Sequence, residues 1–404
     1  MSETIRIESL GAKGDGTGGG VFVPFTLPGA SVEIERAGQR GRLISVVERS
    51  QERAEPPCPH FGACGGCDLQ HASPALYTAF KRGLVVDAFA RAGIEADVAP
   101  LVSCAPASRR RAAFTAVRAG PRVLLGFHQS RSHRIEDLKT CLVVVPEIER
   151  ALPLLRRLAA LLIDRKRPLR LTVLSTGPGL DIAIDDAAKL TETLRRQAVS
   201  LAIEARIARL AVAGEALIET ARPAIQLGRT TVLPPPGAFV QAVADAEDAM
   251  ARTVLEHLNG AKRIVDLFCG IGTFTLRLAA QAPTHGVESE ADAIAALDVA
   301  ARAAPGLRPI TSERRDLFRR PVTTKELDRF DGLVFDPPRA GAEAQAQQIA
   351  ASKIDRVAAV SCNPTTLARD AVILLEGGYR LLSVTPIDQF LWSHHVEAVA
   401  LFER

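Results

Sequence analysis

Cys362 is the residue whose type and position most clearly point to chemistry. It lies in the segment SCNPTTLARD (residues 361–370), directly after the apolar run of residues 357–360. A parallel strand that ends here would present the thiol at the carboxyl edge of a sheet, where ligands bind. A thiolate there could add to C6 of a pyrimidine and make C5 nucleophilic, and a base would then have to remove the C5 proton. Because a lone cysteine is more often a small buried apolar residue, the remaining motifs must decide.

A glycine turn indicates a nucleoside-containing cofactor. The segment DLFCGIGTF (residues 266–274) runs from an apolar stretch into a turn, where Gly270 and Gly272 allow a ligand to approach the backbone closely. Glu288 ends the next apolar stretch and could bind both hydroxyls of a ribose. Thr275 stands where a dinucleotide-binding turn would have its third glycine. The pattern therefore favours the shorter loop of S-adenosylmethionine enzymes.

A second acidic residue follows a later strand. Asp336 begins the segment DPPRAG (residues 336–341), and its two prolines fix the backbone so that the carboxylate projects in one direction. Such a loop is common in methyltransferases that act on planar, nitrogen-bearing substrates. Taken alone, it could also be a structural loop end with a capping aspartate.

Three cysteines near the N-terminus have the spacing of a metal or cluster site. Cys58, Cys64 and Cys67 lie within ten residues, and Cys141 is the best candidate for a fourth ligand. Four-cysteine zinc sites are common structural elements, so zinc is the ordinary interpretation. Cys104 and Cys269 are interpreted as non-ligands.

The predicted secondary structure that must position these residues differs between three parts of the chain. Alternating apolar residues in short runs over residues 5–47 predict a small closed β-barrel. The middle region combines a hairpin at residues 111–128 with a helix near residues 150–163. From residue 263 onward, strands and helices alternate, which predicts a parallel sheet with helices on both faces. We therefore expect three domains, at residues 1–50, 51–240 and 241–404.

Charge is distributed unevenly. Residues 109–170 contain 15 Lys and Arg against 5 Asp and Glu, a local net charge of +10 in a chain of net charge +4. This excess favours a polyanion-binding face that includes Arg109, Arg110, Arg111, Arg131 and Arg134, although a solvated arginine-rich surface would look the same. The sequence shows no leader-like segment and no apolar stretch of membrane-spanning length, so a cytoplasmic location is expected. Separately, the chain is expected to be a monomer.

In this order, the glycine turn, DPPRAG, SCNPTTLARD and the terminal His395-Val396-Glu397 resemble the RNA uracil-C5 methyltransferase family. The resemblance covers most of the chain. It implies a class I, Rossmann-like α/β domain that uses S-adenosylmethionine, preceded by an oligonucleotide-binding-type barrel similar to a TRAM domain and a mixed central region.

Carried over by motif, the resemblance assigns roles to single residues. Cys362 corresponds to the nucleophile and Glu397 to the general base. The cofactor contacts implied are Gln241, Phe268, Gly270, Thr273, Glu288, Asp316 and Asp336. The resemblance to ribosomal RNA members implies a [4Fe-4S] cluster on Cys58, Cys64, Cys67 and Cys141. This chain departs from the family at Phe390-Leu391, where the family usually has Phe-Pro, and at Thr273, where it often has Asn.

The interpretation we favour is an enzyme that methylates C5 of a uridine in 23S ribosomal RNA. A transfer-RNA T-loop methyltransferase is the nearest alternative. An RNA-binding iron–sulfur protein without activity is disfavoured because both Cys362 and Glu397 are present. An NAD-dependent oxidoreductase is disfavoured by the missing third glycine.

Overall fold

The N-terminal residues form a small curled sheet. The computed structural model describes residues 2–164 and 166–404. The first sheet has the strand order β1-β5-β6-β4-β3-β2, so its two edge strands are consecutive in the chain. Its strands are β1 (Ser2–Arg6), β2 (Ser9–Leu10), β3 (Gly16–Gly18), β4 (Val21–Val23), β5 (Ser31–Ala37) and β6 (Arg40–Glu48). Ile7, Val23, Val32 and Ile34 are buried inside it, which agrees with the alternation in the sequence.

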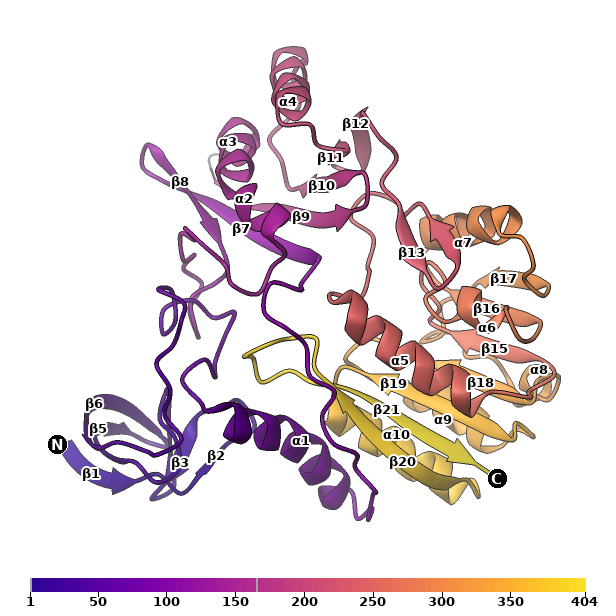
Figure 1. Cartoon of the computed structure of the whole chain (residues 1–404), viewed down its shortest axis with the longest axis horizontal. Helices are drawn as coiled ribbons and strands as arrows, with labels where there is room; N and C mark the ends of the chain where they lie inside the picture. Colours follow the sequence, from indigo (N-terminus) through magenta and orange to yellow (C-terminus); the bar gives the residue numbers. More distant parts are fainter. Residues whose placement is uncertain (1, 165) are drawn as a thin grey trace.

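A second sheet forms the middle of the molecule (Figure 1). Its order is β12-β11-β10-β9-β7-β8. Its strands are β7 (Arg111–Ala119), β8 (Arg122–Gly126), β9 (Leu169–Thr176), β10 (Gly179–Asp185), β11 (Arg209–Val212) and β12 (Glu215–Glu219). The helices that accompany it are α2 (Pro146–Arg150), α3 (Leu152–Leu162) and α4 (Glu192–Glu204). Leu155, Leu158 and Leu162 of α3 are buried because they recur on one face of the helix.

The third sheet has the order β17-β16-β15-β18-β19-β21-β20. Neighbouring strands from β17 to β19 are parallel, and β21 runs antiparallel to both of its neighbours. The strands are β15 (Ile264–Leu267), β16 (Thr284–Glu288), β17 (Ile310–Arg314), β18 (Gly332–Phe335), β19 (Arg356–Ser361), β20 (Arg380–Ile387) and β21 (Glu397–Glu403). The strand order reverses beside β15, so a ligand crevice is expected at the carboxyl ends of β15 and β18. The predicted Rossmann-like α/β domain is confirmed.

Helices cover this third sheet, and a β-hairpin leads into it. The helices are α5 (Ala244–His257), α6 (Thr275–Leu278), α7 (Ala291–Ala303), α8 (Thr324–Leu327), α9 (Glu343–Ala350) and α10 (Pro364–Glu376). The hairpin pairs β13 (Ile225–Leu227) with β14 (Thr230–Val232). No helix in residues 2–164 and 166–404 is long and apolar enough to cross a membrane.

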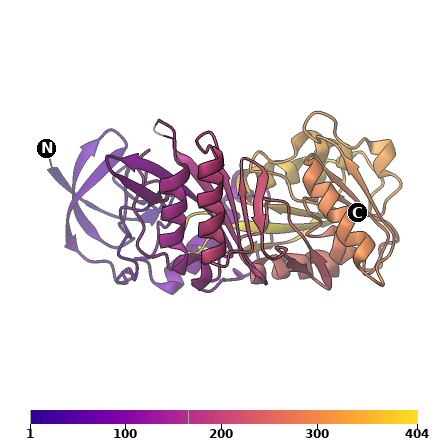
Figure 2. The same ribbon diagram turned by 90° about the horizontal axis from the view of Figure 1, so that it is seen from above.

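One helix early in the chain packs against the third sheet. Helix α1 (Pro74–Arg91) contacts α10 and β20, and Val85 and Phe89 belong to the apolar core of that sheet. The chain after α1 continues along the sheet, where Val98 and Val102 form bridges with β20 at Val384 and Ile387. Figure 1 shows the second sheet above the first, the third sheet to their right, and α1 between the first sheet and the third. Figure 2 shows the first and third sheets at opposite ends of the long axis.

Candidate active site

The glycine turn after β15 has the backbone that a close ligand approach requires. Phe268, Gly270 and Gly272 all have positive φ, and a side chain on Gly272 would lie 2.6 Å from Leu297. Thr275, at the place of the missing third glycine, donates its hydroxyl to the buried carboxylate of Asp266 at 2.6 Å. The threonine therefore fixes the start of α6 against β15.

Glu288 is held firmly at the end of β16. One carboxylate oxygen accepts the Gly270 N–H at 3.0 Å, and the other accepts the N–H groups of Ser289 and Glu290 at 2.6 and 3.0 Å. These bonds place a fixed negative charge beside the glycine turn. The Phe268 ring lies 5.5 Å from the Phe318 ring, two residues after Asp316. The glycine turn therefore lies beside an acidic side chain, Glu288, and a pair of aromatic side chains, Phe268 and Phe318.

Cys362 follows β19 directly and precedes α10. The Asn363 side chain caps α10 by accepting the Thr365 N–H at 3.2 Å, which fixes the turn that carries the cysteine. The pKa of the Cys362 thiol is raised to about 11, first by burial and then by the charges of Glu397 and Asp336, whereas Arg339 lowers it. The Arg339 guanidinium therefore favours the thiolate against these effects.

Glu397 is the first residue of β21 and is almost fully buried. The pKa of its carboxyl is raised to about 8, first by burial and then by the charge of Asp336, whereas a hydrogen bond from Gln389 lowers it. Burial likewise raises the pKa of Asp336 to about 7. A carboxyl group with a pKa near neutrality is suited to accept and release a proton.

Two glutamines join the two acids. The Gln241 side-chain amide donates to Asp336 at 3.1 Å. The Gln389 amide donates to the side-chain oxygens of both Gln241 and Glu397, at 2.7 Å each, and its own oxygen accepts the Ala242 N–H at 2.9 Å. Gln241 was expected at the site from its motif. Gln389 was not, because its partner Gln241 lies 148 residues away.

One pocket of about 810 Å³ contains all nine residues expected at the active site. They are Cys362, Glu397, Gln241, Phe268, Gly270, Thr273, Glu288, Asp316 and Asp336. The pocket opens at the carboxyl ends of β15, β16 and β18, as the strand order predicts. Arg339 of the segment DPPRAG, for which the sequence predicted no role, also lines it.

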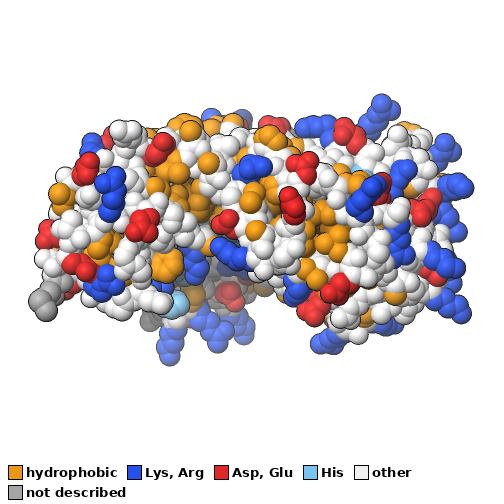
Figure 3. Space-filling model, turned by 90° about the horizontal axis from the view of Figure 1, so that it is seen from below, with side chains coloured by type: hydrophobic (Ala, Val, Ile, Leu, Met, Phe, Trp, Pro, Cys, Tyr) orange, Lys and Arg blue, Asp and Glu red, His pale blue; other side chains and the backbone are white. Residues whose placement is uncertain are grey.

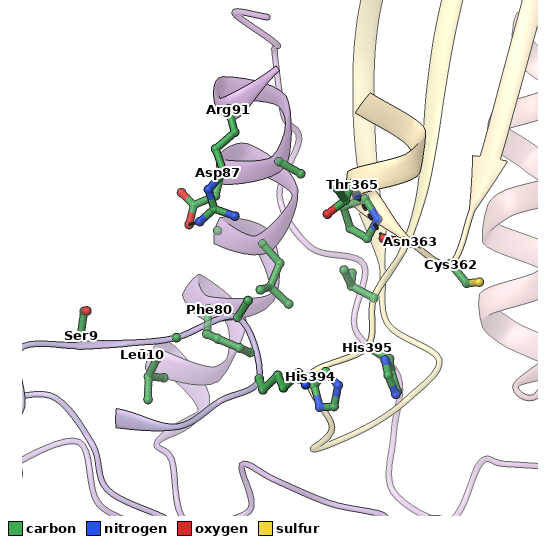
Figure 4. A pocket seen from close by; sticks show the side chains of 18 of the residues that line it. Ser9, Leu10, Phe80, Asp87, Arg91, Cys362, Asn363, Thr365, His394 and His395 are labelled. Atoms are coloured by element: carbon green, nitrogen blue, oxygen red, sulfur yellow. Dashed lines mark hydrogen bonds and ion pairs between the residues drawn. The ribbon is translucent and has the colours of Figure 1, made fainter. Parts of the chain in front are cut away.

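A second hollow reaches Cys362 from another side. This groove has a volume of about 640 Å³ and lies between the first sheet, α1 and the third sheet. Figure 4 shows its walls: Ser9 and Leu10 of the first sheet, Phe80 and Asp87 of α1, and Asn363, Thr365, His394 and His395 opposite them. Cys362 and Arg339 line both the groove and the pocket, and the Cys362 side chain points away from the groove in Figure 4.

The four cysteines expected to bind a cluster line a separate cavity of about 190 Å³. Cys58, Cys64, Cys67 and Cys141 all carry free thiols there. Burial raises the thiol pKa of Cys64 to about 11 and of Cys67 to about 12. Cys104 and Cys269 lie outside this cavity, as expected. Among the described residues, no group of three or more His, Cys, Asp or Glu is placed to hold a metal ion.

The prediction that Arg109, Arg110 and Arg111 belong to a polyanion-binding face is wrong. Arg110 donates to Glu247 at 2.7 Å, Arg111 donates to the Ala238 carbonyl at 2.9 Å, and Arg109 lies over the Phe390 ring. These three side chains contact partners within the protein, because β7 begins where the second and third sheets meet. The exposed cations of this region are Arg118, Arg122, Arg131, Arg134, Lys139, Arg150, Arg157, Lys166, Arg167 and Arg170. Residue 165, also in this region, lies outside the described residues.

The surface seen from below mixes both signs of charge. Figure 3 shows Lys and Arg interspersed with Asp and Glu, with most cations at the end formed by the third sheet. Arg131 is paired with Asp15 of the first sheet, which ties the second sheet region to it. The face seen in this view is therefore not a continuous basic surface.

Comparison with known proteins agrees with the site. A model of the tRNA (Uracil-5-)-methyltransferase family matches residues 179–404. An uncharacterized RNA methyltransferase of Rhizobium meliloti is 52% identical, over 99% of both chains. The 23S rRNA (uracil(1939)-C(5))-methyltransferase of Shewanella amazonensis is 32% identical, over 98% of this chain and 94% of its own.

A solved structure shares the whole fold. The tRNA (uracil-54, C5)-methyltransferase of Pyrococcus abyssi, in complex with S-adenosyl-L-homocysteine, superposes with a TM-score of 0.79. The match covers 99% of both chains at 22% identity. From the family match, the relatives and the site, the chain belongs to the S-adenosylmethionine-dependent RNA uracil-C5 methyltransferase family.

Proposed function

We propose that this protein methylates C5 of one uridine in 23S ribosomal RNA through a covalent cysteine adduct. The observation that carries the proposal is that Cys362 and Glu397 line one pocket together with the residues expected to bind the cofactor. A uracil placed beside the Cys362 thiol would lie next to a methyl donor bound in this pocket. Glu397 lines the same pocket, on the strand beside β19.

The residues of the pocket fit S-adenosylmethionine. The fixed Glu288 carboxylate would bind the ribose hydroxyls, and Phe268 and Asp316 would contact the adenine. Gln241 and Asp336 would lie beside the methionine end, close to Cys362 and Glu397. When bound, S-adenosylmethionine supplies an electrophilic methyl group.

The chain's own residues then account for the covalent steps. Arg339 favours the Cys362 thiolate, which adds to C6 of the uracil and makes C5 nucleophilic. After C5 has gained the methyl group, the Glu397 carboxylate takes the C5 proton, and the C6–S bond breaks to return the thiolate. Gln389 supports this step because its hydrogen bond favours the ionised form of Glu397.

The target RNA can be tested directly. We expect a strain without this gene to lose 5-methyluridine at a single position of 23S RNA, and the purified enzyme to restore it on RNA from that strain. Mapping modified uridines in ribosomal and transfer RNA from the same cells measures both. Loss of the modification in the transfer-RNA T-loop alone would replace ribosomal RNA with transfer RNA as the substrate.

We further propose a [4Fe-4S] cluster on Cys58, Cys64, Cys67 and Cys141. Four free thiols line one cavity, so the number and type of side chains match four cysteine ligands, although their positions do not form a metal-binding group. The cluster would brace residues 58–71 against the second sheet region, where Gly65 already donates to the His128 carbonyl at 2.9 Å.

Protein purified without oxygen should be brown and contain iron and acid-labile sulfide in nearly equal amounts. Cys67→Ser should lower both contents, since it removes a ligand, whereas Cys104→Ser should leave them unchanged because Cys104 lies outside the cavity. Absorption spectra and metal analysis measure the difference. Colourless protein that contains one zinc ion would show that the site is a structural zinc site.

For the domains, we propose that residues 1–50 act as a TRAM-like barrel and residues 51–240 as the cluster-binding and RNA-binding region. Residues 241–404 would then form the methyltransferase domain. The groove supports this division, because the first sheet forms one of its walls opposite the segment that contains Cys362.

A further inference from the structure

The loop between β20 and β21, residues 388–396, brings three side chains to the active site. We call it the base loop. Gln389 donates to Glu397, and Phe390 lines the pocket beside Cys362. The Arg339 guanidinium lies 2.9 Å from a ring nitrogen of His395. A nine-residue hairpin loop is long, so such side chains hold their positions only if the loop itself is fixed.

Lys81 of α1 fixes both ends of the base loop. Its side chain is fully buried, and its ammonium donates to the Asp388 carboxylate at 3.0 Å and to the Phe390 carbonyl at 3.1 Å. The third donor reaches the His395 carbonyl. All three hydrogens of one ammonium group are therefore used, and each acceptor lies in or next to a residue that contacts the active site.

Two more side chains hold the base loop. The Tyr77 hydroxyl, one turn before Lys81, donates to Asp388 and accepts the Trp392 N–H at 2.9 Å. Asp68 accepts the His394 N–H at 3.1 Å, and the backbone N–H of Asp68 donates to the Trp392 carbonyl at 2.7 Å. Leu391 stands in this chain where the family usually has a proline, so these contacts, and not a proline ring, restrict the loop.

A contribution to the stability of the fold is a weak explanation for the presence of the buried Lys81–Asp388 ion pair. Two fully buried charges lose their hydration, and replacing such a pair with neutral side chains of similar volume is often neutral or stabilising. A buried ammonium group that donates to three acceptors instead fixes the positions of those acceptors relative to one another. We infer that Lys81 is a positioning residue for the proton-abstraction step: it holds the base loop so that Gln389 stays bonded to Glu397. This inference rests on the proposed covalent mechanism.

The test separates positioning from stability. The double variant Lys81→Met/Asp388→Asn leaves no buried charge unpaired, so we expect it to fold and to bind S-adenosylmethionine normally. Its thermal stability should be lowered, because methionine leaves the Phe390 and His395 carbonyls without their donor. Turnover should fall on the order of 10- to 100-fold, because a loosened loop displaces the Gln389–Glu397 pair. With ordinary RNA and cofactor, the covalent protein–RNA adduct should accumulate, since methyl transfer still occurs but the C5 proton leaves slowly.

Three comparisons complete the experiment. 5-Fluorouridine RNA has no C5 proton, so it should label the double variant at close to the wild-type rate. Arg82→Met is the matched control: Arg82 follows Lys81 on α1 and donates to the Val98 and Ala99 carbonyls instead of the loop. It should not accumulate adduct. Glu397→Gln serves as the reference for a blocked proton-abstraction step.

The outcomes distinguish this inference from the proposed function. If Glu397→Gln forms no adduct, Glu397 is not the proton acceptor, and its proposed role and this inference fail together. If Glu397→Gln accumulates adduct but the folded double variant turns over normally, or slows without adduct, only the positioning role of Lys81 is overturned. Should the double variant fail to fold, Asp68→Ala, which loosens the base loop from its partly exposed side, must show the same accumulation.

Discussion

Cys362→Ala should abolish methylation while leaving the binding of RNA and S-adenosylmethionine intact. Without the thiol, C5 of uracil is not made nucleophilic, so we expect a loss of turnover on the order of 10⁴-fold or more, as when other enzymes lose a nucleophile. Alanine is smaller than cysteine, and Cys362 lies on the wall of two hollows, so the fold should tolerate the change. Transfer of a radioactive methyl group to RNA measures the loss.

The matched control is Cys104→Ala, which removes a half-buried thiol that lines neither the pocket nor the groove. It should methylate normally. Wild-type enzyme trapped with 5-fluorouridine RNA should carry the RNA on Cys362 and not on Cys269, which is buried beneath the glycine turn. Methylation by the Cys362→Ala protein would end the covalent mechanism.

Glu397→Gln should convert the enzyme into one that traps its own substrate. The amide has nearly the shape of the acid and can stay hydrogen-bonded to Gln389, but it cannot take the C5 proton. The C6–S bond then persists after the methyl group has been added. We expect turnover to fall about 10²- to 10⁴-fold, the range for loss of a general base. A protein–RNA band stable to denaturing electrophoresis, dependent on S-adenosylmethionine, measures the trapped species.

Glu403→Gln tests the specificity of this result. Glu403 lies at the other end of β21 and is paired at the surface with Arg380. It should leave both turnover and adduct level unchanged. If Glu397→Gln turned over at the wild-type rate, another group would have to be the base, and Asp336 would be the nearest candidate because it lines the same pocket.

The sequence alone predicted the third sheet and the positions of its functional residues. Strands and helices there have strong local signals: apolar runs, a glycine turn and proline-bounded loops. The apolar run at residues 357–360 lies in β19 at Arg356–Ser361, directly before Cys362, and the alternation of strands and helices predicted from residue 263 onward is confirmed. Because the ends of parallel strands meet at one edge, residues predicted at separate strand ends line one pocket.

Only the tertiary structure decided how those residues are held. The sequence could not show that Arg109, Arg110 and Arg111 point inward. An arginine that is hydrated at the surface and one that binds a partner inside the protein cannot be distinguished by residue type. Nor could it show that α1 packs on the third sheet, or that Lys81 bonds to Asp388, 307 residues away. Local patterns determine strands, turns and their ends. Partners so far apart in the chain are chosen by packing, which leaves no periodic signal in either segment.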